Sequence, residues 1–275
     1  MSKDYFAYNA GTDEIPADAF RISPSQLSKF LDSTSQWYHE QVLGEAPAFQ
    51  GSTASELGNC IHAAAEMYFD TRSVDKEAIF AYIDSITNPE VDKAVIKAQI
   101  APMVETLINK FLSKNVGTHA EMFVKTEIKP GIWAAGSVDM FDANKGIIYD
   151  YKTMGSLDTA RVPTSFPRSY WFQQLTYAYI LRQMGYTVNA VKLIYISRSN
   201  TGRVSDKTGK PLKDYPSECN IIYEPVTDEN MNIIHGVLQV IADSVKLYRE
   251  KPELRHVLAQ DFRLYQKPKP QLFKD

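Results

Sequence analysis

Residues 136–153 read GSVDMFDANKGIIYDYKT, two short runs rich in β-forming residues on either side of the turn sequence Ala-Asn-Lys-Gly. A four-residue turn at that point would pair Phe141 with Ile148 and set Asp139 opposite Asp150 on the neighbouring strand. The stretch therefore predicts an antiparallel hairpin that places two carboxylates side by side.

Lys152 follows Asp150 by two residues, so the strand period directs both side chains to one face of the sheet. Two opposed carboxylates repel each other, which favours a cation between them, and hard oxygen ligands suit Mg²⁺ or Mn²⁺. Lys152 could then orient a water molecule or neutralise charge that develops on a phosphate. From spacing alone, a surface salt-bridge cluster of Asp139, Asp150 and Lys152 fits equally well.

The periodicity along the chain predicts an α/β fold with a helical N-terminal part and a central mixed sheet flanked by helices. We expect a single domain over residues 1–275, with loose termini at 1–20 and 262–275. Helices are predicted over 25–44, 55–69, 76–86, 91–114, 169–184 and 228–249, and strands over 123–128, 132–141, 147–153, 191–197 and 220–224.

Composition limits the function classes. The 275 residues carry a net charge of −3, no apolar stretch of membrane-spanning length and no apolar run typical of a signal peptide, which predicts a soluble, cytoplasmic protein. Cys60 and Cys219 are too few for a four-thiolate zinc or iron–sulfur site, so we expect both to be small buried hydrophobes.

Two helical pairs add candidate site residues. His62 and Glu66 lie one turn apart in the helix predicted over 55–69, and Gln173 and Tyr177 lie one turn apart in the helix after the hairpin. Such residues could complete a site or contact a nucleic acid. A structural histidine and a helix flank with satisfied side chains are the commoner arrangements.

Charge is distributed unevenly. Residues 144–213 contain eleven lysines and arginines against three aspartates, a net charge of +8, so the rest of the chain carries −11. Arg161, Arg168, Arg198 and Arg203 lie in or beside predicted loops and are candidates for binding the DNA backbone. A solvated basic face is the competing interpretation.

Taken together, these motifs resemble the PD-(D/E)XK nuclease superfamily, in particular its RecB-like branch, which includes phage and RecE-type exonucleases. The resemblance runs from Ser23 to about Ser197 and is carried by SPSQLSKF at 23–30, Leu57-Gly58-x-x-x-His62, Gly136-x-x-Asp139, Asp150-Tyr151-Lys152-Thr153 and Gln173-x-x-x-Tyr177, in that order. Iron–sulfur members of the branch carry additional cysteines that this chain lacks, so no cluster is expected.

The resemblance implies a restriction-endonuclease-like core and assigns roles to individual residues. Asp139, Asp150 and Lys152 would be catalytic, and one or two Mg²⁺ or Mn²⁺ ions would be bound by His62, Asp139, Asp150 and the backbone carbonyl of Tyr151. Glu127, which matches an acidic position on the preceding strand, would support the site together with Gln173 and Tyr177.

The function implied is a metal-dependent DNA exonuclease of phage-type recombination or DNA processing, acting in the cytoplasm of the host cell if a phage encodes it. DNA is the expected partner, with a single-strand annealing or recombination protein as a second, and the oligomeric state stays open. A structure-specific endonuclease of the same fold and a nuclease-fold DNA-binding protein without catalysis are the alternatives.

Overall fold

The computed structural model describes residues 3–7, 14–45, 51–115, 117–205 and 207–251. In chain order its elements are β1 (Phe20–Ile22), the 3₁₀ turn η2 (Pro24–Gln26), α1 (Leu27–Asp32), α2 (Thr34–Gln41), α3 (Thr53–Thr71), α4 (Lys76–Ser85), α5 (Lys93–Leu107), the π-helical turn η3 (Ile108–Leu112), β2 (His119–Lys129), β3 (Ile132–Asp142), β4 (Ile147–Met154), α6 (Arg168–Gln183), β5 (Ala190–Ser197), β6 (Cys219–Pro225) and α7 (Asp228–Glu250).

The strands form one mixed sheet, as the sequence predicted, in the order β1-β3-β4-β5-β6, with β2 paired to β3 as well. β2 and β4 run antiparallel to β3, whereas β1 is parallel to β3 and β5 is parallel to β4. Phe141 pairs with Ile148 across a four-residue turn, as predicted, but the ladder ends at Met140 and Tyr149, so Asp139 and Asp150 do not pair as expected. This register brings the two motif-bearing strands together.

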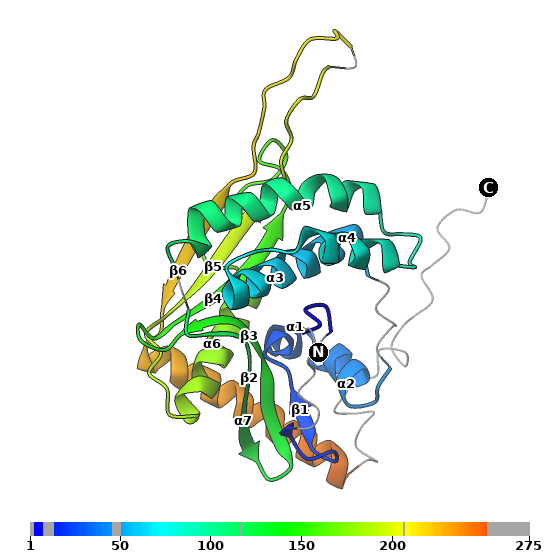
Figure 1. The fold of residues 1–275 in the computed structure, drawn as a ribbon. Helices are drawn as coiled ribbons and strands as arrows, with labels where there is room; N and C mark the ends of the chain where they lie inside the picture. The colour runs from blue at the N-terminus through cyan, green and yellow to red at the C-terminus, as the bar shows by residue number, and fades with distance from the viewer. Residues whose placement is uncertain (1–2, 8–13, 46–50, 116, 206, 252–275) are drawn as a thin grey trace, which may run out of the picture.

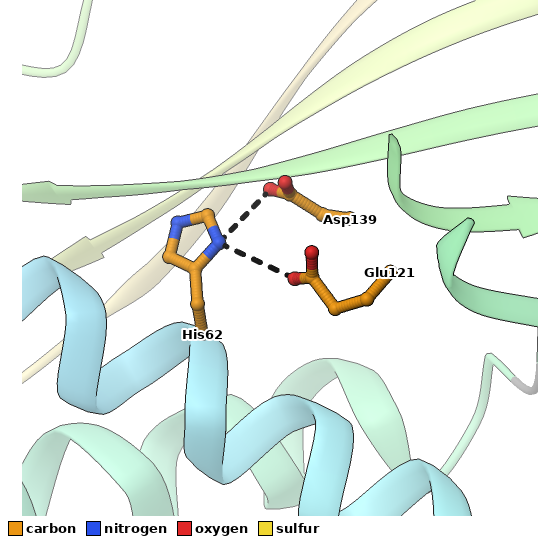
Figure 2. A group of neighbouring side chains, drawn as sticks. All are labelled: His62, Glu121 and Asp139. Atoms are coloured by element: carbon orange, nitrogen blue, oxygen red, sulfur yellow. Dashed lines mark ion pairs between the residues drawn. The ribbon is translucent and has the colours of Figure 1, made fainter. Parts of the chain in front are cut away.

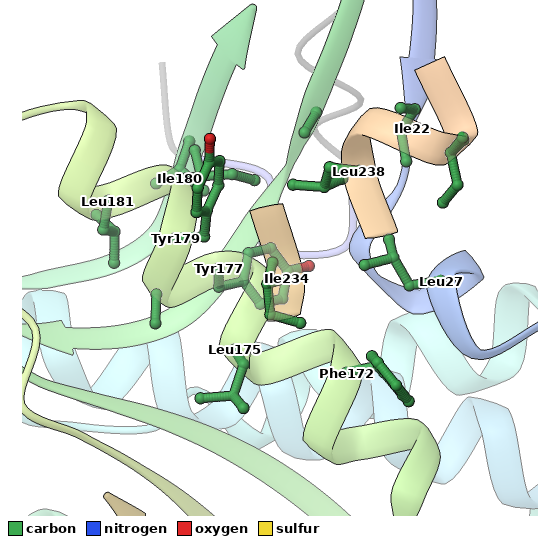
Figure 3. Packing of buried hydrophobic residues seen from close by; sticks show 14 of the residues in the cluster. Ile22, Leu27, Phe172, Leu175, Tyr177, Tyr179, Ile180, Leu181, Ile234 and Leu238 are labelled. Carbon is green, nitrogen blue, oxygen red and sulfur yellow. The ribbon is translucent and has the colours of Figure 1, made fainter. Parts of the chain in front are cut away.

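Helices cover both faces of the sheet (Figure 1), with α3, α4 and α5 on one side and α6 and α7 on the other. Successive residues of β4 point to opposite faces, so Ile148 packs in the core under α6 and α7 while Tyr149 packs in the core under α3 and α5. Figure 3 shows the first of these cores, where Leu175 of α6 and Ile234 of α7 lie close together. The sheet is thus buried on both sides.

The first half of the chain differs from the prediction at three points. The helix expected over 25–44 is broken at Ser33, whose side chain accepts a hydrogen bond from Gln36 N and so caps α2. β1 was not predicted, because three residues are too few to show a period. β2 begins at His119, four residues before the predicted start, because it pairs with the whole of β3.

Residues 3–7 pack on the helical layer, where the sequence suggested a loose terminus. Lys3 Nζ lies 2.7 Å from Glu66 and 2.8 Å from Asp70 on α3, and Phe6 stacks on Tyr82 of α4 with ring centroids 4.1 Å apart. The predicted loose segment 262–275 lies outside the described residues. Within the described part of the chain, no helix is long and apolar enough to cross a membrane.

Gly136 on β3 allows α6 to approach the sheet closely. A Cβ atom at this position would lie 2.9 Å from the Tyr177 hydroxyl, 3.0 Å from its ring and 3.2 Å from Pro24. Tyr177 is buried in this contact and packs α6 against the strand that carries Asp139. The contact explains why glycine occupies the first position of the Gly136-x-x-Asp139 motif.

We therefore expect Gly136→Ala to lower the free energy of unfolding by about 1–3 kcal/mol, because the added methyl group overpacks a tight contact. Gly236 on α7 is the matched control, since a Cβ there meets no atom within 4 Å. Gly236→Ala should raise the free energy of unfolding by roughly 0.5–1 kcal/mol. Urea denaturation measures both, and equal stability of the Gly136 variant and the parent protein would contradict the first expectation.

Candidate metal and catalytic site

The site forms where β3 and β4 separate. Their paired residues run from Asp142 and Ile147 to Met140 and Tyr149, and beyond that point the strands no longer pair with each other. At this point the side chain of Asp139 replaces the backbone pairing of the two strands, because its Oδ2 accepts a hydrogen bond of 2.8 Å from the backbone N–H of Tyr151. The side chain of Asp139 thereby satisfies a strand donor at the start of the gap.

His62 reaches this gap from α3. Its Nε2 lies 3.1 Å from the backbone carbonyl oxygen of Tyr151. Its Nδ1 lies 3.5 Å from Asp139 Oδ2 and 3.9 Å from Glu121 Oε1, the two contacts drawn in Figure 2. Tyr151 therefore contacts His62 through its backbone carbonyl oxygen and Asp139 through its backbone N–H. This arrangement brings together three of the predicted metal-site residues, His62, Asp139 and Tyr151.

Glu121 is a site residue that the sequence analysis missed. On β2 its neighbours Ala120 and Met122 pair with Met140 and Val138, so Glu121 lies opposite Asp139. Its φ of 46° lies in the left-handed region, which is strained for a residue with a side chain. No sequence pattern reveals such a backbone conformation, and the predicted strand began too late to include Glu121.

Glu127, the predicted acidic residue of this strand, is not brought to the site. It lies near the β2–β3 turn, where its Oε1 accepts the backbone N–H of Gly131 at 2.9 Å. Six residues of extended strand separate it from Glu121, a distance of roughly 20 Å. The acidic residue of β2 at the site is therefore Glu121.

Asp150 and Lys152 form a buried ion pair beside the gap. Lys152 Nζ lies 2.6 Å from Asp150 Oδ2, and the ammonium group sits over the ring of Tyr170 at 4.8 Å from the centroid. The second oxygen of Asp150 accepts a hydrogen bond of 2.7 Å from Gln174 Nε2. The prediction named Gln173, but one residue is a rotation of about 100° around a helix, and it is Gln174 that faces the sheet.

Burial and neighbouring charges set the protonation of the site. Burial alone would lower the pKa of His62, but Asp139 and Glu121 outweigh it and raise that pKa well above 6.5. Burial raises the pKa of Asp150 to about 6, despite the opposing effect of Lys152. Burial also works against the charged form of Lys152, yet Asp150 and Asp139 raise the pKa of Lys152, so it is a cation at neutral pH.

His62, Glu121 and Asp139 together fit a divalent cation. Each offers one ligand atom, and these atoms all lie within 4.8 Å of one another. Two carboxylates and an imidazole are ligands that such ions accept. Burial raises the pKa of Glu121, and the neighbouring Asp139 carboxylate adds to that shift against the effect of His62. A cation would relieve this repulsion between the two acids.

The predicted DNA-binding arginines occupy different surroundings. Arg168 forms an ion pair with Asp32, and Arg203 lies 2.7 Å from Asp158. The backbone N–H of Arg198 donates to the carbonyl of Met154, and Arg161 is exposed in the loop after β4. Both ion pairs tie parts of the chain together, so charge alone does not make these arginines a nucleic-acid interface.

Comparison with known proteins identifies the family and the fold. The sequence profile of the PD-(D/E)XK nuclease superfamily matches residues 21–263. A crystal structure of a candidate exonuclease from Eubacterium rectale is similar with a TM-score of 0.51 and 16% identity, over 90% of this chain and 86% of that chain. A crystal structure of a phage-related exonuclease from Haemophilus somnus gives a TM-score of 0.44 and 10% identity, over 82% of this chain and 95% of that chain. No curated protein sequence matches.

The first of these structures shares the mixed α/β architecture of the restriction-endonuclease-like fold, as the sequence predicted. The nuclease superfamily uses divalent metal ions, and the cluster of His62, Glu121 and Asp139 is a place that could bind one.

The raised pKa of His62 gives a direct test of this cluster. Because His62 is protonated at pH 7, a cation that binds its Nδ1 must release about one proton. We expect calorimetric titration with Mn²⁺, in two buffers of different ionisation enthalpy, to detect that proton. His62→Ala should weaken binding and abolish the release.

His235→Ala is the matched control, since His235 lies on α7 beside Tyr179. This variant should release the proton as the parent protein does. If the parent protein binds the metal without releasing a proton, His62 is not one of the metal ligands.

Proposed function

The chain belongs to the PD-(D/E)XK nuclease superfamily, and from this premise we propose that it is a metal-dependent DNA exonuclease. The observation that carries the proposal is that a potential cation site and a buried ion pair lie on either side of the gap between β3 and β4. His62, Glu121 and Asp139 form a potential cation site, and the Asp150–Lys152 ion pair stands on the next strand. In metal-dependent hydrolysis of a phosphodiester, a cation can activate water and a positioned donor can stabilise the charge that develops on the scissile phosphate.

In the proposed reaction a water molecule loses a proton to solvent as its oxygen forms a bond to phosphorus, the P–O3′ bond breaks, and O3′ takes up a proton from solvent. Lys152 is a cation, so it serves as a hydrogen-bond donor to the water or to a phosphate oxygen and not as a base. Asp150 holds the ammonium group in place, and Gln174 orients Asp150. A side chain locked from two sides gives the donor a fixed geometry.

The cation would be held by His62, Glu121 and Asp139, with Asp150 and the carbonyl of Tyr151 as the further ligands that the family resemblance implies. When bound, it would activate water and stabilise the leaving oxygen. An imidazole in the set favours Mn²⁺, while the carboxylates also accept Mg²⁺. We propose that either ion supports activity and that Mn²⁺ binds more tightly.

An exonuclease, rather than an endonuclease, is proposed because the E. rectale protein of similar fold is named as an exonuclease. We further propose a role in phage-type recombination or DNA processing, together with a single-strand annealing or recombination protein. The arginines at 161, 168, 198 and 203 stay candidates for contacts to the DNA backbone.

Lys152→Ala should lower the turnover of linear DNA by at least about 100-fold, because it removes the donor at the scissile phosphate. Asp150→Asn should have a similar effect, since Lys152 loses its partner. The matched control is Lys192→Ala on β5, where the lysine also lies over a tyrosine ring, at 5.7 Å from the centroid of Tyr149. That variant should keep the parent activity in Mg²⁺ or Mn²⁺, and a fully active Lys152 variant would refute the assignment.

The exonuclease form is tested with end-labelled linear duplex and covalently closed circular DNA of the same sequence. We expect the linear DNA to be degraded from its ends and the circle to persist, with all activity lost in chelator. Cutting of the closed circle would contradict the exonuclease assignment and support an endonuclease of the same fold. Inactivity on both duplexes and on single strands would favour a DNA-binding protein without catalysis.

A further inference from the structure

A two-stranded ribbon projects from the body between β5 and β6, and we call its described residues, 199–205 and 207–217, the β5–β6 arm. Figure 1 shows it as the yellow loop that leaves the molecule beyond α5. Its strands are joined by bridges between Asn200 and Tyr215 and between Val204 and Pro211. The hydrogen bond from Leu212 N to Arg203 O, 2.9 Å long, adds to them. The arm is therefore a paired structure and not an open loop.

The base of the arm is fixed to two other elements. Asp158, in the loop after β4, accepts hydrogen bonds from Asn200 at 2.6 Å and from Arg203 at 2.7 Å. The backbone of Ser199 exchanges two hydrogen bonds with the side chain of Gln99 on α5. These contacts set the direction of the arm relative to the sheet.

The arm leaves the sheet beside the candidate site. β5 is parallel to β4, and Tyr195 is the register partner of Lys152. The arm begins four residues after Tyr195, roughly 13 Å further along the strand direction. A polymer whose phosphate lies at Lys152, and which runs along the direction of β4 and β5, would pass the base of the arm.

The outer part of the arm presents both cations and apolar side chains. Lys207, Lys210 and Lys213 are exposed, and so are Val204 and Leu212, with relative exposures of 57% and 40%. From its base the ribbon reaches roughly 25 Å. An isolated two-stranded ribbon is marginally stable in water, and exposed apolar side chains on it gain stability only against a partner.

We propose that the β5–β6 arm binds double-stranded DNA next to the cleavage site, an inference that rests on the proposed nuclease function. A two-stranded ribbon fits the major groove of a duplex, which is about 12 Å wide. Lys207, Lys210 and Lys213 contact backbone phosphates, while Val204 and Leu212 contact the base edges. The arm thus directs the enzyme to duplex substrate, because a single strand has no groove to receive it.

The test is a triple variant, Lys207→Gln, Lys210→Gln and Lys213→Gln, whose binding to duplex and to single-stranded oligonucleotides is measured in chelator, so that DNA is not cut. For duplex, the slope of log affinity against log salt should become shallower by up to about 2.7, since each phosphate contact contributes about 0.9. Single-strand binding should change little. The corresponding triple lysine-to-arginine variant keeps the charges and should bind duplex as the parent protein does.

A matched control neutralises Lys76, Lys114 and Lys246, three exposed lysines on α4, after η3 and on α7. It should leave the salt slope unchanged. The proposal is overturned if the arm variant keeps the parent slope, if the control loses as much, or if single-strand binding falls as far as duplex binding.

Hydrolysis of a thymidine 5′-phosphate nitrophenyl ester, too small to reach the arm, separates this proposal from the nuclease function. The arm variant should cleave this ester at the parent rate. If the parent protein does not cleave it and degrades no DNA, the nuclease function fails, while the binding data still decide whether the arm contacts duplex.

Discussion

The site depends on one hydrogen bond, from the backbone N–H of Tyr151 to the carboxylate of Asp139. Two strands that separate leave backbone donors and acceptors unpaired, and unpaired buried groups are costly. Here the donor of Tyr151 is taken by Asp139 and its carbonyl lies next to His62 Nε2. One peptide residue therefore sets α3, β3 and β4 relative to one another, and the separation of the strands becomes the place where the charged groups meet.

The charges gathered at that place explain why a cation fits. Asp139, Asp150 and Glu121 face two cations, His62 and Lys152. If His62 gives up its proton to bind an ion, three carboxylates and one ammonium group leave a charge of −2. A single divalent ion neutralises that charge in a buried setting, where unbalanced charge is expensive. A second ion would need further negative charge, which the phosphate of a substrate supplies.

Local rules were enough to predict the hairpin, whereas backbone strain and helical phase hid two of the site residues from the sequence. The four-residue turn determined the pairing of Phe141 with Ile148, but the predicted pairing of Asp139 with Asp150 does not form, because the strands separate after Met140 and Tyr149. Glu121 was missed because its backbone has a left-handed conformation, so the direction of its side chain does not follow the alternation of an ordinary strand. Gln174 was missed by one residue. Gln173 and Gln174 lie four and three residues before Tyr177, both about one helical turn away, and only the packing of α6 determines which of them faces the sheet.

The distribution of positive charge shows why a count of residues does not locate an interface. The segment from 144 to 213 carries +8, yet Arg168 and Arg203 are held by Asp32 and Asp158, and Lys152 is held by Asp150. The Lys152–Asp150 pair belongs to the candidate site, the Arg203–Asp158 pair fixes the base of the β5–β6 arm, and the Arg168–Asp32 pair joins α6 to α1. The lysines beyond the base are placed on an exposed ribbon, where a cation keeps its long-range attraction for phosphate. The positive charge of residues 144–213 is thus used partly in ion pairs within the fold and partly on exposed lysines of the β5–β6 arm.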